Sequence, residues 1–270
     1  MEINKNVSKL IEKFSKLDEV EGILLAGSHA LGTNDSNSDY DLYIYVSDFI
    51  DVSKRKEICD EFFEYIELNN TFWETEDDGF LKDRHIPVEI IYREISWITE
   101  NLDRVLFEFK ADAGYTTCFW SNFINSIILY DKNGRLKELQ NKYKISYPKE
   151  LKENILKKNY ALLKKQMPAY YHQIEKALKR DDLISVNHRV AAFFASYFDI
   201  IFAINEFPHP GEKKILKIIR DNKLKVPNDM EKTVLNILKY SGSSDDKILE
   251  QINLLIHDLD ELLNHEGFKY

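Results

Sequence analysis

Strand-like patterns occur only in the first part of this sequence, and that division constrains the fold more than any other feature. Residues 20–26 form a compact apolar run, and residues 39–46 alternate polar and apolar side chains with a period of two. From about residue 113 onward no segment resembles a strand, and apolar residues recur at helical spacing. The sequence therefore predicts an α+β fold, with a small mixed sheet and covering helices over residues 1–145 and an all-α helical bundle over residues 146–270.

The same patterns predict the remaining elements. Two further strands are expected at residues 71–76 and 85–92 around a polar turn that contains Gly79, with Pro87 at the entry of the second strand. A short helix or turn is expected after the strand at 20–26. Helical spacing predicts longer helices at residues 3–17, 52–67, 94–109, 119–130, 135–143, 149–180, 182–205, 211–221, 228–240 and 245–264, the sixth of them broken near Pro168.

The composition excludes several classes of protein. Of the 270 residues, 44% are hydrophobic and 31% are charged, which is enough apolar side chain for a core and excludes disorder, collagen and a multi-span membrane protein. The two cysteines, Cys59 and Cys118, are far apart and in no metal-ligand spacing. This spacing argues against a disulfide framework and fits a reducing compartment.

Charge and hydropathy limit the expected partners. The net charge is −9, and an acidic chain does not coat nucleic acid, because phosphate binding needs clustered Lys and Arg. We expect no signal peptide, because the first residues run straight into an amphipathic segment. The longest apolar stretch, residues 190–204, contains Asp199 and is shorter than the ~20 residues of a bilayer span. We therefore expect a cytoplasmic protein with no membrane or nucleic-acid partner. If it binds phosphates, it does so at one site, with backbone donors, a few basic residues or a metal ion.

The residues best suited to chemistry lie between positions 27 and 41. Asp39 and Asp41 are two residues apart on an expected strand, so both carboxylates leave the same face. Two adjacent carboxylates repel each other unless a cation lies between them, and Mg²⁺ suits such oxygen ligands when phosphates complete its shell. Gly27 allows the backbone to approach a phosphate closely, and a helix that starts at Gly27-Ser28 offers free N–H groups to an anion.

Glu89 adds a third acidic residue in an expected strand, between Val88 and Ile90. In a mixed sheet it could project beside Asp39 and Asp41, and three carboxylates on one face are costly without a metal ion. Taken singly, a Gly-Ser pair is typical of a turn, an Asp-x-Asp of a solvated strand edge and a Glu of the surface. Their combination in a strand–turn–loop–strand context favours a functional site.

The motif resembles the signature of the DNA polymerase beta-like nucleotidyltransferase superfamily. Residues 27–32 fit its Gly-Ser-x-Ala-x-Gly form, and ten residues separate the Gly-Ser pair from Asp-Tyr-Asp at residues 39–41. Glu89 stands where that superfamily carries its third carboxylate. The helical half resembles that of bacterial antibiotic nucleotidyltransferases, and segments 187–191 and 208–213 are similar to those of a bacterial group of stand-alone nucleotidyltransferase-like proteins.

The resemblance implies a Mg²⁺-dependent enzyme that moves a nucleoside monophosphate from a nucleoside triphosphate, expected to be ATP, to a hydroxyl group with release of pyrophosphate. Asp39 and Asp41 would hold the metal, with two ions expected, and Glu89 would act as a metal ligand or as general base. The expected nucleotide-binding residues are Gly27, Ser28, Ser38, Arg189 and Lys213.

Three basic residues have open roles. Arg189, at the start of an apolar helix, is expected to be buried and to need an anionic partner, either the triphosphate or an acid of the core such as Asp199. Lys213 follows a Pro-Gly step and either reaches a phosphate or is a solvated first-turn lysine. His29 replaces the Arg or Lys common after Gly-Ser, and either touches phosphate or caps the turn.

The acceptor is expected to be a small hydroxylated molecule, and the acidic charge fits a cationic one. Protein adenylylation is the nearest enzymatic alternative. A non-catalytic nucleotide-binding or antitoxin-like module is the alternative from a different class. The presence of all three carboxylates favours an enzyme.

Overall fold

A computed structural model describes residues 3–32, 38–243 and 245–268, and the chain divides into two compact units. The first unit comprises Met1–Asp103 and Phe119–Ile145, and the second comprises Arg104–Cys118 and Ser146–Tyr270. Within the described ranges, no helix has both the length and the hydropathy needed to cross a membrane.

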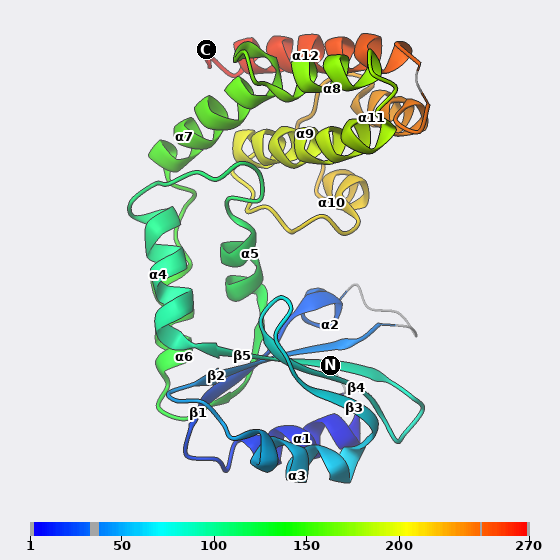
Figure 1. Cartoon of the computed structure of the whole chain (residues 1–270). Helices are drawn as coiled ribbons and strands as arrows, with labels where there is room; N and C mark the ends of the chain where they lie inside the picture. Colours follow the sequence, from blue (N-terminus) through cyan, green and yellow to red (C-terminus); the bar gives the residue numbers. More distant parts are fainter. Residues whose placement is uncertain (1–2, 33–37, 244, 269–270) are drawn as a thin grey trace. The chain divides into compact units, whose positions relative to one another are not determined.

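A six-stranded mixed sheet forms the centre of the first unit, in the order β3-β4-β5-β2-β1-β6 (Figure 1). The central pair, β2 and β5, is parallel, and every other pair of neighbours is antiparallel. The strands are β1 (Val20–Leu25), β2 (Tyr40–Val46), β3 (Phe63–Asn70), β4 (Thr75–Leu81), β5 (Pro87–Glu94) and β6 (Ile127–Asp131). The helices associated with this sheet are α1 (Lys5–Phe14), α2 (Gly27–Leu31), α3 (Val52–Phe62), α4 (Ile95–Leu106), α5 (Cys118–Asn125) and α6 (Arg135–Tyr143).

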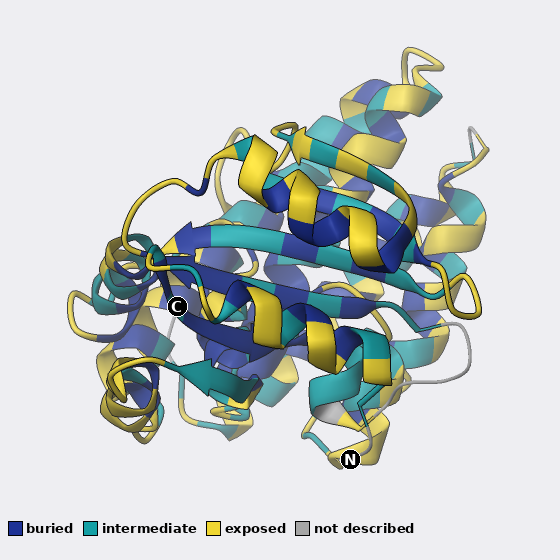
Figure 2. Ribbon diagram, turned by 90° about the horizontal axis from the view of Figure 1, so that it is seen from below, coloured by how far each residue is buried: buried dark blue, intermediate teal, exposed yellow. Residues whose placement is uncertain are grey.

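The alternation along β2 explains how the two faces of the sheet are used. Leu42 and Ile44 point into a hydrophobic core that includes Leu10 of α1 and Phe62 of α3. The buried sides of α1 and α3 meet the sheet, and their other sides are exposed (Figure 2). Asp41, Tyr43 and Tyr45 therefore face the opposite side, where α2 and α5 lie (Figure 1). The sheet is closed on one face by packing, and its other face carries polar side chains.

Helices form the second unit. The longest, α9 (Leu183–Ile204), is buried along most of its second half and packs against α7 and α8. The elements of this unit are α7 (Lys149–Tyr160), the π-helix η1 (Ala161–Lys165), α8 (Tyr170–Leu178), α9, α10 (Ile215–Asp221), α11 (Met230–Tyr240) and α12 (Lys247–His265).

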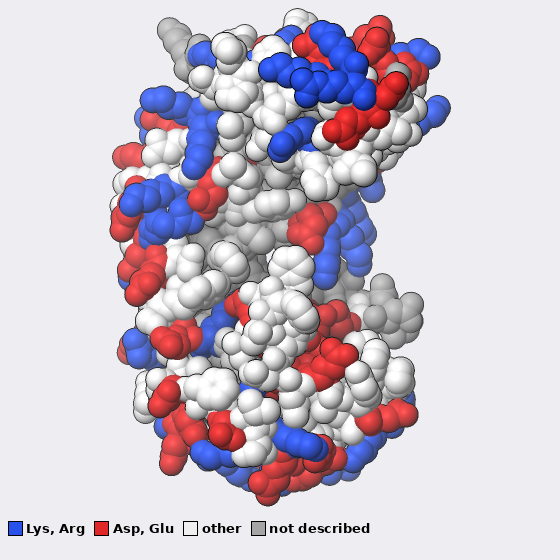
Figure 3. Space-filling view, in the orientation of Figure 1, with Lys and Arg blue, Asp and Glu red and all other residues white. Residues whose placement is uncertain are grey.

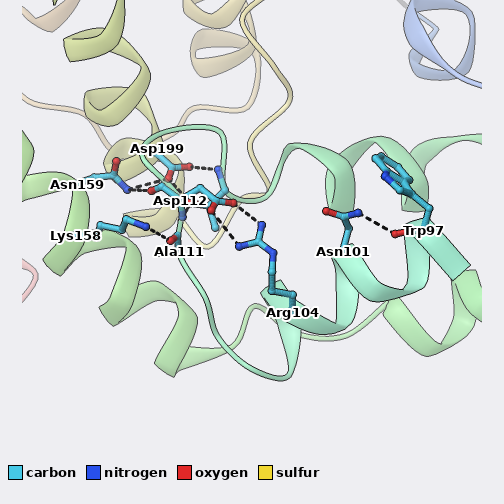
Figure 4. A network of polar contacts seen from close by, with 9 residues as sticks. Trp97, Asn101, Arg104, Ala111, Asp112, Lys158, Asn159 and Asp199 are labelled. Carbon is cyan, nitrogen blue, oxygen red and sulfur yellow. Dashed lines mark hydrogen bonds and ion pairs between the residues drawn. The ribbon is translucent and has the colours of Figure 1, made fainter. Parts of the chain in front are cut away.

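A buried polar network joins the segment 104–118 to α7 and α9 (Figure 4). Asp199 of α9 accepts hydrogen bonds from the Thr116 backbone N–H at 3.1 Å, the Thr116 hydroxyl at 2.7 Å and the Asn159 side-chain amide at 3.1 Å. The Asn159 amide also donates to the Asp112 carbonyl, and Arg104 pairs with the Asp112 carboxylate at 2.6 Å. Burial raises the pKa of Asp199 to about 7.

Most expected elements are present, and two expectations between residues 52 and 81 are wrong. The helix expected over 52–67 ends at Phe62, and β3 begins at Phe63. The strand expected at 71–76 is β4 at Thr75–Leu81, so Gly79 lies in a strand and not in a turn. A Cβ atom at Gly79 would lie 2.3 Å from the Tyr65 carbonyl oxygen of β3, which explains a glycine inside this strand.

Residues 119–131 bring one further correction. The helix expected over 119–130 ends at Asn125, and Ile127–Asp131 form β6, although no strand was expected there. Pairing with β1 stabilises this short segment as a strand, and its own sequence pattern is helical in spacing. The expected break near Pro168 is confirmed, because helix stops at Lys165 and resumes at Tyr170.

Candidate active site

The register between β2 and β5 brings the predicted carboxylates together. Asp41 is the direct partner of Glu89 in this parallel pair, and Asp39 precedes the first residue of β2. Each of the three half-buried residues offers a carboxylate oxygen, and these oxygens lie within 4.8 Å of one another. The strand pairing therefore places all three acids on the face of the sheet that α1 and α3 leave uncovered.

The donor set of this cluster fits a divalent cation. Carboxylates this close repel one another, and their mutual repulsion falls when a cation binds between them. Oxygen ligands of this kind are the ones that Mg²⁺ prefers, and Mg²⁺ keeps open positions for water and for substrate phosphates. Asp39, Asp41 and Glu89 are thus a suitable set of protein ligands for Mg²⁺.

Gly27 brings the backbone against this cluster. It starts α2 directly after β1, where the Ala26 N–H donates to the Asp41 carbonyl at 2.9 Å. Gly27 has a φ of +60°, and a Cβ atom there would lie 1.7 Å from Oδ2 of Asp41. Only glycine permits both this left-handed conformation and this approach. The close contact in the structure is between Gly27 and Asp41, and the predicted approach of Gly27 to a phosphate stays a prediction.

Two polar atoms beside Gly27 are buried without a partner. Ser28 Oγ and His29 Nε2 have no hydrogen bond within the described part of the chain. A buried polar group without a partner costs about 1–3 kcal/mol, which an incoming anion would offset. The His29 ring stacks on Tyr40 at 4.1 Å, and the Tyr40 hydroxyl accepts from the Asn4 backbone N–H. This stacking fixes His29 next to the turn and leaves Nε2 available.

The other predicted nucleotide-binding residues lie elsewhere. Ser38 directly precedes Asp39 and is half-buried. Arg189 and Lys213 belong to the second unit, and both are exposed. The expectation that Arg189 is buried is wrong, because the face of α9 that carries Val186 and Val190 enters the core and Arg189 lies off that face. Phosphate binding by these three residues stays a prediction.

Two acidic residues near the cluster were missed by the sequence analysis. In the β4–β5 register Asp78 is the partner of Glu89, and Glu76 lies two residues earlier on the same face. Burial raises the pKa of both carboxyls, and nearby Asp78 and Glu89 raise that of Glu76 further. If Gly79 had been recognised as a strand residue, the spacing of Glu76 and Asp78 would have placed both on one face of that strand.

An arginine with aromatic neighbours was also missed. Arg93 lies four residues after Glu89 on β5 and is 7% exposed. Its guanidinium donates to both carboxylate oxygens of Glu74, at 2.7 and 2.6 Å, and stacks 4.2 Å from the Tyr43 ring centroid and 5.0 Å from that of Trp97. The Glu74 carboxylate thereby fixes the β3–β4 connection to the polar face of the sheet.

Comparison with known proteins finds two family models that match different parts of the chain. The family model described as "Polymerase beta, Nucleotidyltransferase" matches residues 8–94, and a model described as a domain of unknown function (DUF4037) matches residues 119–215. A solved nucleotidyltransferase-like protein from Exiguobacterium sibiricum 255-15 is 11% identical, with a TM-score of 0.43 over 97% of this chain and 74% of that chain. No curated protein matches this sequence.

Proposed function

We propose that this chain transfers a nucleoside monophosphate from a nucleoside triphosphate to a hydroxyl group of a small molecule, because residues 8–94 form a nucleotidyltransferase domain of the polymerase beta family. ATP is the expected donor. The observation that carries this proposal is the carboxylate cluster of Asp39, Asp41 and Glu89, whose oxygens lie within 4.8 Å of one another beside Gly27.

In this proposal Asp39, Asp41 and Glu89 hold Mg²⁺. When bound, Mg²⁺ supplies positive charge that offsets the negative charge of the phosphates and of the leaving group. The backbone at Gly27 and the hydroxyl of Ser28 contact the terminal phosphates, which gives the buried Ser28 Oγ the partner it lacks within the described residues. Ser38, Arg189 and Lys213 are further candidates for phosphate contact.

The chemical step is an in-line displacement. The acceptor oxygen forms a bond to the α-phosphorus, the bond from that phosphorus to the bridging oxygen breaks, and pyrophosphate leaves with the electron pair. The hydroxyl proton passes to a carboxylate, and Glu89 is our candidate for that role. The contribution of the protein is to position the two substrates and to fix the charges around them.

Calorimetry tests the binding half of this proposal. Titration with ATP should show binding with Mg²⁺ present and a sharp loss of affinity in EDTA. Asp41→Asn should reproduce that loss in the presence of Mg²⁺. Asp48→Asn, which removes the same charge from an exposed residue shortly after β2, is the matched control and should bind like the wild type. Equal ATP affinity with and without Mg²⁺ would contradict a carboxylate metal site.

A further inference from the structure

An open cavity of about 1290 Å³ lies within the second unit, between the segment 104–112, α7, η1 and the residues that follow α12. Small-molecule sites commonly measure about 300–1,000 Å³, so this cavity has room for a ligand of nucleotide size. Its wall is basic, although the chain has a net charge of −9. Lys and Arg side chains gather over α7 on the surface (Figure 3). Against three acidic side chains, the cavity has five basic ones, namely Arg104, Lys110, Lys157, Lys158 and Lys165.

Two of these basic side chains are not used by the protein itself. Each acidic side chain of the wall is in an ion pair, and the pairs are Arg104–Asp112 at 2.6 Å, Lys110–Glu108 at 2.7 Å and Lys149–Glu153 at 3.9 Å. Lys158 donates to the Ala111 carbonyl (Figure 4). Lys157 and Lys165 are exposed, and their ammonium groups form no ion pair or hydrogen bond within residues 3–32, 38–243 and 245–268. These two cations therefore remain for an anionic ligand.

The π turn brings these two lysines to one side of the helix. η1 follows α7 directly, and the Gln166 N–H donates to the Ala161 carbonyl, five residues earlier, at 3.1 Å. In a regular α-helix, residues eight apart are separated by about 80° around the axis. The wider π turn takes up the extra residue, so that Lys157 and Lys165 both line the cavity, at most about 12 Å apart along the axis. Single π turns of this kind occur frequently at functional sites.

The segment 104–112 forms a second wall that is fixed to α7. The Asn154 side-chain amide donates to the Phe109 carbonyl at 2.8 Å, and the Lys158 ammonium donates to the Ala111 carbonyl. Both bonds hold main-chain groups of the segment in place without any ligand. The cavity is therefore formed in advance, and a ligand loses little affinity to the ordering of this wall.

Aromatic side chains complete the cavity. Phe109, Tyr160 and Phe268 line it and are half-buried. The Tyr160 hydroxyl donates to Asp260 at 2.8 Å, which fixes the orientation of that ring. Flat rings of a ligand pack favourably on aromatic side chains, and nucleobases do so without regard to sequence. The cavity thus combines a surface for an aromatic ring with two available cations.

We propose that this cavity binds an aromatic ligand with two phosphate groups on separate atoms, the chemistry of a nucleoside bisphosphate. Lys157 and Lys165, two turns apart, each bind one phosphate, and the aromatic side chains contact the nucleobase. Every acidic side chain of the wall is in an ion pair, so lysine binds the phosphates directly, as point charges, without a divalent cation. The site shares no residue with the carboxylate cluster and does not depend on the proposed function.

Calorimetry in EDTA tests this site with adenosine 3′,5′-bisphosphate as the probe. EDTA removes Mg²⁺, so the binding that remains is independent of metal ions. We expect saturable binding that weakens at higher salt, because salt screens contacts between lysine and phosphate. Adenosine 5′-monophosphate, which lacks one phosphate, and inorganic pyrophosphate, which lacks the ring, should each bind at least tenfold more weakly.

Variants locate the binding. Lys157→Gln and Lys165→Gln should each weaken the binding of adenosine 3′,5′-bisphosphate tenfold or more, since each removes a charged contact. Lys176→Gln changes an exposed lysine of α8 outside the cavity and is the matched control, which should bind like the wild type. Phe109→Leu keeps apolar bulk and removes a ring, so it should weaken the binding of adenosine 3′,5′-bisphosphate and leave that of pyrophosphate unchanged. An unchanged melting temperature shows that each variant is folded.

Four outcomes would overturn the proposal. They are no binding of adenosine 3′,5′-bisphosphate in EDTA, equal binding of inorganic pyrophosphate, wild-type affinity in both Lys157→Gln and Lys165→Gln, and an equal loss of affinity in Lys176→Gln. The second outcome would make the cavity a general anion site, the third would place the ligand elsewhere, and the fourth would indicate attraction to surface charge alone. The proposed function is tested separately, with ATP and Mg²⁺, and stands or fails on its own.

Discussion

Glu89 is the carboxylate whose role decides where the acceptor proton goes. It is the partner of Asp41 across β2 and β5, and its position suits both a metal ligand and a base. Glu89→Gln keeps the shape and removes the charge. We expect pyrophosphate release to fall by roughly 10²–10⁴-fold, the usual contribution of a positioned base, and excess Mg²⁺ not to restore it. Recovery at high Mg²⁺ would make Glu89 a ligand alone, and wild-type turnover would remove it from the site.

Two glycines of one short segment form a matched pair of variants. Gly27 and Gly32 both have left-handed φ angles, +60° and +65°, so alanine is strained at either. A Cβ at Gly27 would collide with Oδ2 of Asp41, whereas a Cβ at Gly32 meets nothing within 4 Å. We expect Gly27→Ala to lower Mg²⁺-dependent ATP affinity at least tenfold and Gly32→Ala to cost only stability, about 1 kcal/mol. Equal ATP affinity in both variants would show that the close approach of Gly27 to Asp41 is not needed.

At the scale of elements, the network around Asp199 joins segment 104–118 to α7 and α9. The folded pKa of Asp199, about 7, is above the ordinary value of 3.8, because burial disfavours the charged form. The folded state therefore holds more protons than the unfolded chain between pH 4 and 7. The contribution of Asp199 to the free energy of unfolding is complete below pH 4 and falls as the pH rises to 7, by at most about 1.4 kcal/mol per pH unit.

Asp199→Asn tests this linkage. The variant cannot ionise, so its free energy of unfolding should rise relative to the wild type by about 1–3 kcal/mol between pH 5 and pH 8. Urea unfolding of both proteins at several pH values measures this difference. Burial also lowers the pKa of His209 to about 4, but that contribution is common to both proteins and cancels. A difference that does not change with pH would contradict the raised pKa of Asp199.

Local sequence patterns predicted the elements that depend on their own residues. The alternation over 39–46 gave a strand observed at Tyr40–Val46, and the break near Pro168 is present. β6 was missed because its five residues become a strand through pairing with β1, far away in the sequence. The role of Gly79 was also hidden, since the atom that excludes a side chain there belongs to β3.

The site residues that could be predicted are those whose relative positions follow from their spacing along one strand. Asp39 and Asp41 were recognised from their alternation, and Glu89 from its strand and from the family resemblance. Asp78 and Arg93 were not recognised, because their relation to the cluster depends on the register of β4 and β5 and on the fold of the hairpin. Neighbours along one strand can be identified from the sequence, whereas neighbours on adjacent strands depend on a register that the sequence does not show.

At the scale of the whole molecule, the chain combines a net charge of −9 with a proposed chemistry on triphosphates. Such a protein needs specific groups that bind phosphate directly or through a metal ion. In the first unit the candidates are Gly27, Ser28 and the carboxylate cluster. The division into domains at 1–145 and 146–270 stays a prediction. In the structure residues 104–118 group with the second unit, to which the Asp199 network binds them.

Transfer of the α-phosphate tests the central claim most directly. Wild-type protein, Mg²⁺, ATP labelled at the α-phosphorus and a panel of hydroxylated amines should yield labelled acceptor and pyrophosphate in equal amounts. Asp41→Asn should abolish both products, and Asp48→Asn should retain them. Release of inorganic phosphate without labelled acceptor, or undiminished transfer by Asp41→Asn, would contradict nucleotidyl transfer at this cluster.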